Sequence, residues 1–230
     1  MNDQKRVSDI TMKHPMHYLE KHPFFLIKWV NNARINYLIK QIGNVDRKVI
    51  ADIGCESGIL LSKIYNKYSY VKKIFAVDLS EYALGIAKRK ANKEGWLRKT
   101  QFIVSDAENI KIKDNFVDLT ISSNVLEHLT NPQKGFNELV RITRKNGVII
   151  LHLPNEKKII FFKKLFKAIS PRLLGNLKIV TPGHKHFPDK KFIMDLVKKC
   201  PYKIKIISFN KGPAISLFGL YYYVTIKKLA

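Results

Sequence analysis

Short runs of apolar residues recur along the chain, and longer stretches of mixed character separate them. The runs lie at residues 48–51, 73–78, 100–106, 116–122 and 148–153. In the stretches that begin near residues 59, 81 and 131, apolar residues recur every three or four positions, as on the buried face of a helix. Buried strands that alternate with helices predict a doubly wound parallel sheet.

The two ends of the chain add further predicted elements. Residues 23–42 show helical spacing of apolar positions before the first strand. The last third predicts a short helix at 190–199 and two strands at 202–209 and 220–228, with glycine and proline between the strands. Such a pair favours an antiparallel closure of the sheet. With no linker-like stretch in its middle, the chain is expected to form one domain over residues 1–230.

Composition narrows the setting of the protein. Two cysteines, Cys55 and Cys200, are too few for a disulfide framework and favour a reducing, cytoplasmic environment. The polar N-terminus is unlike a signal peptide, and the apolar stretch at 214–226 is too short to span a bilayer. The formal net charge of +24 predicts an anionic partner, unless the lysines only make the surface soluble.

Residues 52–58, with the sequence DIGCESG, lie between the first predicted strand and its helix. Gly54 and Gly58 have no Cβ, so the backbone can turn tightly and a ligand can approach it closely. The first turn of the following helix offers free N–H groups and a partial positive charge to a carboxylate or phosphate. A strand that leads through a glycine turn into a helix is typical of a nucleotide-binding site.

Acidic residues also end the second and third predicted strands, at Asp78 and Asp106. Asp78 follows Gly58 by 20 residues, where an acidic side chain would bind the hydroxyls of a cofactor ribose. Alternatively, Asp78 belongs to a turn or caps the helix at 81–93, for which Ser80 is also a candidate cap. Asp106 could face the exocyclic amine of a purine. The carboxyl ends of parallel strands meet at one edge, where we expect the cofactor.

Taken in order, four segments resemble the motifs of the class I S-adenosylmethionine-dependent methyltransferases. They are DIGCESG at 52–58, VD at 77–78, SDAE at 105–108 and DLTISSNVLEHL at 118–129. The resemblance implies an α/β, Rossmann-like, doubly wound sheet of seven mostly parallel strands with the last strand antiparallel, and S-adenosylmethionine as cofactor. The cofactor-binding residues that it implies are Arg34, Asp52, Gly54, Cys55, Glu56, Gly58, Asp78, Leu79, Asp106, Ala107, Ser123 and Asn124.

A looser resemblance is to the polyprenyl-hydroxybenzoate and ubiquinone-biosynthesis O-methyltransferases. It is carried by residues 31–37, which include Arg34, by Leu-Glu-His at 126–128, and by residues 183–187. The resemblance implies that His184 and His186 lie near the acceptor. It also implies an arginine contact with the cofactor, at Arg34.

Two positions depart from these families. Glu56 replaces the middle glycine of the turn, and its carboxylate would oppose that of the cofactor unless the side chain points to water. We therefore expect Glu56 to weaken cofactor binding. In the ubiquinone enzymes a glutamate before Leu-Glu-His completes a divalent-cation site, but Asn124 takes its place here. Glu127 and His128 alone make a poor site, so no metal is expected.

His128 is the candidate catalytic base. Methyl transfer from a sulfonium has a neutral leaving group, so the proton to be removed is that of the acceptor. His128 follows the fourth predicted strand, near the expected methyl group, and histidine ordinarily titrates near neutral pH. The alternative is a helix-cap or packing role for His128. His152, in the fifth strand, is expected to be packed.

The same region argues against two classes of nucleic-acid enzyme. Amino-group methylases of bases carry Asn/Asp-Pro-Pro-aromatic after the fourth strand, where this chain has Ser-Asn-Val-Leu. Cytosine-C5 enzymes need a Pro-Cys nucleophile there, and neither cysteine qualifies. Nucleic acid is therefore less expected than a small-molecule acceptor, although a ribose or tRNA methyltransferase is not excluded.

A basic amphipathic insertion is predicted at residues 156–187. Residues 156–205 hold 14 Lys/Arg and 3 Asp/Glu. Wound as a helix, residues 157–169 place Lys157, Lys163, Lys164 and Lys167 on one face and aromatic and aliphatic side chains on the other. This pattern is typical of a helix at a membrane interface, here with an anionic surface. The alternative is an ordinary helix that covers the substrate cleft.

Together these patterns predict a cytoplasmic methyltransferase that is peripheral at the inner membrane face. We expect it to methylate a hydroxyl of an amphipathic or lipid-linked small molecule. An RNA methyltransferase is one alternative. The other is a non-catalytic basic binding module that keeps the fold, with Glu56 blocking the cofactor.

Overall fold

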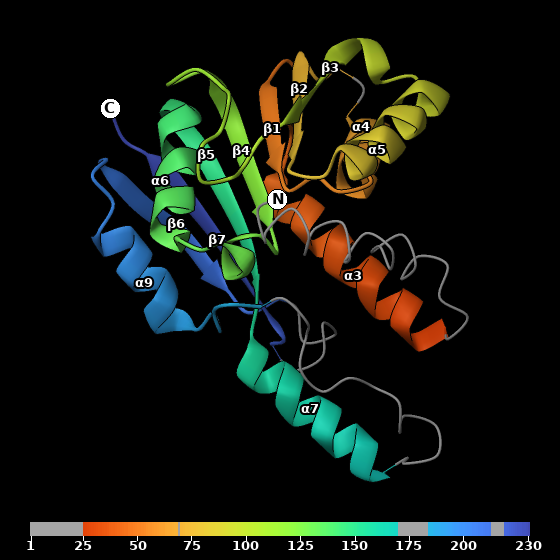
Figure 1. Cartoon of the computed structure of the whole chain (residues 1–230), viewed down its shortest axis with the longest axis vertical. Coiled ribbons are helices and arrows are strands. Elements are labelled where there is room, and N and C mark those ends of the chain that lie inside the picture. Colours follow the sequence, from red (N-terminus) through yellow and green to blue (C-terminus); the bar gives the residue numbers. More distant parts are fainter. Residues whose placement is uncertain (1–24, 69, 170–183, 213–218) are drawn as a thin grey trace.

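The computed structural model describes residues 25–68, 70–169, 184–212 and 219–230. One sheet runs through them, with helices on both faces (Figure 1). Its strands are β1 (Val49–Ile53), β2 (Lys73–Asp78), β3 (Thr100–Val104), β4 (Val117–Ser123), β5 (Thr143–Pro154), β6 (Ile204–Asn210) and β7 (Tyr221–Lys228). The α-helices are α3 (Phe25–Ile42), α4 (Ile59–Lys67), α5 (Glu81–Glu94), α6 (Pro132–Ile142), α7 (Glu156–Ile169) and α9 (Lys190–Lys198). Short 3-10 turns are η1 (Leu97–Lys99) and η2 (Leu126–His128).

The strand order is β3-β2-β1-β4-β5-β7-β6. Strand β7 runs antiparallel to both of its neighbours, and the other neighbouring pairs are parallel. The predicted seven-stranded, mostly parallel sheet with an antiparallel last strand is therefore confirmed. The order reverses between β1 and β4, and ligands of such sheets bind at the carboxyl ends of the strands beside that reversal.

Side chains of the central strands alternate between two cores. On β1, Ile50 packs with α3, α4 and α5, whereas Ala51 and Ile53 pack with α6 and α9. On β2, Ile74 and Phe75 alternate in the same way. Because both faces are covered, these strands are apolar at nearly every position, as expected for a parallel sheet buried between helices.

Strand β5 begins at Thr143, five residues before the predicted start at 148. This part of the strand was not predicted because its sequence at 144–147, Arg-Lys-Asn-Gly, has no apolar side chains. Thr143 pairs with Val117, and its buried hydroxyl lies 2.7 Å from that of Thr120. A Cβ on Gly147 would lie 2.7 Å from Cγ2 of Thr143, 2.9 Å from the carbonyl oxygen of Arg144 and 3.1 Å from that of Asp118, so glycine permits this close approach of the backbone beside β4.

The elements at the two ends of the predicted organisation are also present. Helix α3 matches the predicted segment from residue 25 onward, and α7 matches the helix at 157–169. Residues 23–24 and 170–183 of the predicted helical segment and insertion lie outside the described residues. In the described part of the chain, no helix combines the length and the hydropathy needed to cross a bilayer.

Candidate active site

The turn between β1 and α4 is held against the end of β2. The amides of Gly54 and Cys55 donate to the carbonyl oxygen of Val77 at 2.8 and 3.0 Å. Gly54 and Gly58 have φ angles of 77° and 74°, in the left-handed region that glycine adopts at little cost. The predicted tight glycine turn at the carboxyl edge of the sheet is therefore present.

Gly54 also brings the ends of β1 and β4 together. A Cβ at this position would lie 2.3 Å from Cγ2 of Val125, in the loop after β4. This contact bridges the point where the strand order reverses. A larger residue at position 54 would push apart the two loops that form the site.

Asp78, at the end of β2, fixes the shape of the turn. Its Oδ2 accepts a hydrogen bond from the amide of Glu56 at 2.9 Å, and its Oδ1 accepts one from the amide of Ser80 at 2.9 Å. Ser80 itself caps α5 through Ala83, as predicted. Each carboxylate oxygen can accept a second hydrogen bond, so the predicted contact with ribose hydroxyls is compatible with this geometry.

Three carboxyl groups share the space around the turn. Burial, together with the nearby carboxylates of Asp78 and Glu56, raises the pKa of Asp52 to about 8. Burial and Asp78 raise the pKa of Glu56 to about 7, while Arg34 acts in the opposite direction. Burial of like charges at one place is costly, so a ligand with positive charge would relieve it.

Glu56 not only replaces a glycine in the sequence motif but also has a backbone conformation that glycine favours. Its φ angle is 47°, in the left-handed region. The side chain is partly buried and lies within electrostatic reach of Arg34, which is 5% exposed. The guanidinium of Arg34 also lies 5.3 Å from the centre of the Tyr221 ring. Arg34 therefore lies within electrostatic reach of the turn, and its contact with the cofactor stays a prediction.

Leu79, Asp106 and Ala107 lie on the neighbouring edge of the site. All three are partly buried, and the amide of Ser105 donates to the carbonyl oxygen of Asp78 at 3.1 Å, which joins the ends of β2 and β3. Oδ1 of Asp106 accepts the amide of Glu108 at 2.9 Å. The side chain of Asp106 thus shapes its own loop, and its contact with a purine amine stays a prediction.

Ser123 and Asn124 follow β4 and are tied to β5. The Ser123 hydroxyl lies 2.9 Å from Nδ1 of His152, and the amide of Asn124 donates to the His152 carbonyl oxygen at 2.9 Å. Burial lowers the pKa of His152 well below its ordinary value, so the ring is neutral and packed, as predicted. Asn124 has a φ angle of 55°, and its buried Oδ1 has no hydrogen-bond partner among the described residues.

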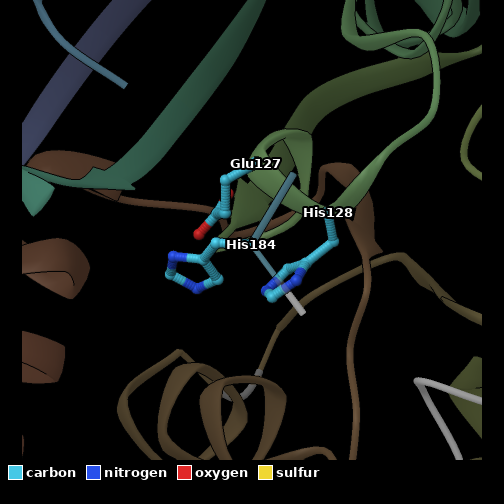
Figure 2. Close-up of side chains that lie close together, drawn as sticks. All are labelled: Glu127, His128 and His184. Carbon is cyan, nitrogen blue, oxygen red and sulfur yellow. The ribbon is translucent and has the colours of Figure 1, made fainter. Parts of the chain in front are cut away.

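His128 lies in η2, three residues after the Val125 that contacts Gly54. The ring is partly buried and meets the ring of His184 edge-to-face, with centroids 4.6 Å apart (Figure 2). The backbone amides of Lys185 and His186 both donate to the carbonyl oxygen of Glu127, at 2.9 and 3.1 Å. The segment that carries His184 is thereby docked on η2.

The two predicted acceptor histidines differ in their surroundings. Nδ1 of His184 lies 2.5 Å from Oε1 of Glu156, the first residue of α7. Nε2 of His186 lies 3.1 Å from the carbonyl oxygen of Leu129, and its ring packs near Phe192. His184 therefore joins His128 beside η2, whereas the ring of His186 is engaged with the adjacent backbone. The acceptor role of both stays a prediction.

Two buried glutamates lie beside His184, and neither was predicted to lie near the acceptor. Glu127 is 0% exposed, and neither of its carboxylate oxygens has a hydrogen-bond partner among the described residues. Glu156 is 1% exposed, and its close partner is Nδ1 of His184. Burial, with the Glu156 carboxylate adding to it, raises the pKa of Glu127 to about 8. The available signal for Glu156 was its place at the end of β5, on the same edge as Asp52 and Asp78.

Comparison with known proteins agrees with this geometry. Residues 51–151 match a family described as "Methyltransferase domain". The matched range begins in β1 and ends in β5, so it contains the glycine turn, Asp78 and η2.

Two curated relatives have names from quinone biosynthesis. A ubiquinone biosynthesis O-methyltransferase of Rickettsia typhi is 27% identical over 140 residues, which are 59% of this chain and 54% of that protein. A ubiquinone/menaquinone biosynthesis C-methyltransferase of Coxiella burnetii is 21% identical over 160 residues, 69% of this chain and 63% of that protein. The chain thus matches only between about half and two thirds of these relatives' length.

Among solved structures, a SAM-dependent methyltransferase from Aquifex aeolicus is similar in fold. The TM-score is 0.62 at 16% identity, and the match covers 85% of this chain and 89% of that one.

The residues at the glycine turn fit the cofactor of this family. S-adenosylmethionine carries an ammonium, a sulfonium and a carboxylate, and the turn presents Asp52 and Asp78 to positive charge and the start of α4 to negative charge. The buried Oδ1 of Asn124 and Oγ of Ser57 have no partner among the described residues and are available to a ligand. The fold, the match of residues 51–151 to a methyltransferase domain and this fit make the chain similar to the class I S-adenosylmethionine-dependent methyltransferases.

Proposed function

We propose that the protein transfers the methyl group of S-adenosylmethionine to an oxygen of an amphipathic or lipid-linked small molecule. The observation that carries this proposal is the position of His128. Its imidazole lies on η2, immediately beyond the loop that contacts the glycine turn, and it is partly open to solvent. A base is needed there only if the acceptor loses a proton on methylation, as a hydroxyl does.

The cofactor supplies an activated methyl group, and the protein supplies position and proton removal. Asp78 and the turn would hold the cofactor, Arg34 would face its carboxylate, and His128 would accept the proton of the acceptor hydroxyl. The covering segment at 184–186 would exclude water from the reacting atoms. Positioning by these groups would supply much of the rate enhancement.

Two further features support a lipid-like acceptor. The names of both curated relatives refer to ubiquinone biosynthesis, and one of them is an O-methyltransferase. Helix α7 leaves β5 at the edge of the site and extends away from the sheet (Figure 1). On α7, Phe161 is 60% exposed and Leu165 is 41% exposed, beside the exposed Lys157 and Lys164. An apolar strip beside lysines suits the surface of an anionic bilayer.

A methyl-transfer assay distinguishes the acceptor classes. The protein is incubated with radiolabelled S-adenosylmethionine and, separately, with a lipid extract, a water-soluble metabolite extract and RNA from the same cells. The proposal predicts protein-dependent label in the lipid extract. Label confined to RNA would instead support RNA methylation, for which the +24 charge is the motivating observation. Label confined to the water-soluble extract would rule out the lipid-linked acceptor.

The base is tested by His128→Ala. We expect turnover to fall by about 100-fold or more, the usual contribution of general-base catalysis, with little change in cofactor affinity because His128 acts on the acceptor. The pH–rate profile of the variant should also lose an ionisation near neutral pH. Equal turnover in the two proteins would return His128 to a packing role. Calorimetry with the cofactor provides the control for folding.

A further inference from the structure

The imidazole of His128 is carried by a short turn, which restrains it weakly. η2 holds three residues, and a 3-10 turn has poorer hydrogen-bond geometry than an α-helix. A general base must nevertheless lie within hydrogen-bond reach of the proton that it removes. A displacement of about 1 Å can lower the rate by about 100-fold. Contacts from outside η2 are therefore expected to set the position of this ring.

His184 supplies such a contact from a segment that is distant in the sequence. Its ring meets the ring of His128 edge-to-face, with the centroids 4.6 Å apart and the planes at 77° (Figure 2). Pairs of aromatic rings are stabilising in this arrangement. The side chain of His184 is 7% exposed, so the contact is largely shielded from water.

His184 is itself held on two sides. Nδ1 of its ring lies 2.5 Å from Oε1 of Glu156, the first residue of α7. The backbone is fixed as well, because the next two amides donate to the carbonyl oxygen of Glu127. A carboxylate against one nitrogen of an imidazole sets the orientation of the ring. The contacts therefore run from Glu156 through His184 to His128.

The burial of Glu156 is not explained by stability. The residue is 1% exposed, and its Oε2 has no hydrogen-bond partner among the residues that the structure describes. A carboxylate buried in this way lowers stability, and an apolar side chain of similar size would avoid the cost. Proteins keep such costly groups mainly where they serve the activity.

We propose that Glu156 and His184 are positioning residues for His128. Glu156 orients His184, and the ring of His184 holds the imidazole of His128 in the direction of the acceptor. His128 remains the base, and the two other residues exchange no proton with the acceptor. This inference rests on the proposed function, in which His128 removes the proton of the acceptor hydroxyl.

The first test observes the ring of His128 without any acceptor. Proton NMR of the full chain records its ring signals, which are assigned by their absence in His128→Asn. His184→Ala removes the neighbouring ring and should shift these signals, and Glu156→Ala should shift them through the loss of the orienting contact. Glu156→Gln, whose amide oxygen can still accept a hydrogen bond from Nδ1, should largely restore them. His186→Ala is the matched control and should move them little.

The second test measures turnover of the full chain with radiolabelled S-adenosylmethionine and the lipid extract. At saturating cofactor, turnover should fall by about 10- to 100-fold in His184→Ala and in Glu156→Ala. In Glu156→Gln the loss should stay below about three-fold. The KM for the cofactor should change by less than about two-fold, because both residues act on His128 and not on the glycine turn. Thermal unfolding checks that each variant is folded.

A double substitution distinguishes positioning from a merely structural role. Because His184 acts through His128, His184→Ala should not lower turnover further in a protein that already carries His128→Ala. An equal loss with and without His128, or full turnover in folded His184→Ala, would overturn the positioning role and leave the base in place.

Failure of the proposed function gives different results. Full turnover in His128→Ala would overturn the base and the positioning role together. If the lipid extract accepts no label, the proposed acceptor is wrong, and the ring signals of His128 decide the positioning role. Signals that do not respond to Glu156→Ala would then overturn it.

Discussion

At the scale of single residues, Asp78 links the shape of the glycine turn to the cofactor. Its carboxylate accepts the amides of Glu56 and Ser80 and, in our account, the ribose hydroxyls. A hydrogen bond to a charged group is worth ~1.5–3 kcal/mol. Asp78→Ala should therefore lower S-adenosylmethionine affinity by roughly 10- to 100-fold in a calorimetric titration. Asp195→Ala, at an exposed position on α9, is the matched control. Unchanged affinity in Asp78→Ala would refute the ribose role.

Replacement of Glu56 is expected to change cofactor affinity in the opposite direction. Its φ angle of 47° suits glycine better, and at pH 8 a group with a pKa of about 7 is mostly ionised. Glu56→Gly should therefore tighten cofactor binding at pH 8, by several-fold, and should raise stability by about 1 kcal/mol through the relief of backbone strain. Calorimetry and thermal unfolding measure the two effects. Weaker cofactor binding in the variant would make Glu56 a contact residue instead.

Glu127 predicts how stability depends on pH. Its pKa rises on folding from 4.5 to about 8, so the folded chain holds this proton more tightly than the unfolded chain does. The free energy of unfolding should consequently fall as the pH rises from about 4.5 to about 8. In the presence of a chelator, Glu127→Gln should remove part of this fall and stabilise the protein at pH 8 by roughly 1–3 kcal/mol, with little effect at pH 4. Equal stabilisation at both pH values would contradict this explanation.

At the scale of secondary-structure elements, α7 is where the charge of the chain meets an exposed apolar surface. Each lysine near an anionic membrane contributes ~1 kcal/mol, and this attraction weakens with salt. Exchange of Lys157 and Lys164 for Glu should reduce binding to anionic vesicles by at least ~10-fold in a flotation assay. The same exchange of the exposed Lys88 and Arg89 on α5 makes an equal charge change and should have a much smaller effect.

The apolar side of α7 is tested separately. Exchange of Phe161 and Leu165 for Ser should reduce vesicle binding even at low salt, because salt does not weaken an apolar contribution. If the wild-type protein stays with the soluble fraction at low salt, α7 only covers a site for a water-soluble acceptor.

Most of the strands and helices could be predicted because apolar residues recur at the positions that are buried in the folded chain. Strands β1 and β2 are buried on both faces and therefore form continuous apolar runs. The start of β5 could not be found in this way, since residues 144–147 are polar and join the strand through a close backbone approach at Gly147. The spacing of apolar residues along the sequence does not indicate where two backbone segments come this close together.

The residues of the site also divide into those that could be predicted from the sequence and those that could not. Gly54, Gly58 and Asp78 follow strands in the sequence, so topology alone places them at one edge. The groups around Glu127 come together only through tertiary structure: His184 reaches η2 because its neighbours bond to the Glu127 carbonyl oxygen, and Glu156 follows an adjacent strand. The burial of Glu127 and Glu156 is also a property of the folded chain. The energetic cost of ionising these two carboxyl groups could therefore not be predicted from the sequence.

At the scale of the whole molecule, the chain combines a cofactor turn rich in carboxylates with an overall charge of +24. The two features act on different ligands. The acidic turn suits the cationic groups of the cofactor, whereas the lysines outside it suit an anionic surface or polymer. This separation predicts that salt weakens association with lipid or RNA while it leaves cofactor binding nearly unchanged.

Calorimetric titration of the full chain with S-adenosylmethionine measures cofactor binding itself. We expect saturable binding of one cofactor per chain, with an affinity that changes little between low and moderate salt. We also expect loss of this binding in Gly54→Val, because even a Cβ at that position would lie 2.3 Å from the Val125 side chain. A folded wild-type protein that binds no cofactor would contradict the account and would leave a basic binding module that has kept only the fold.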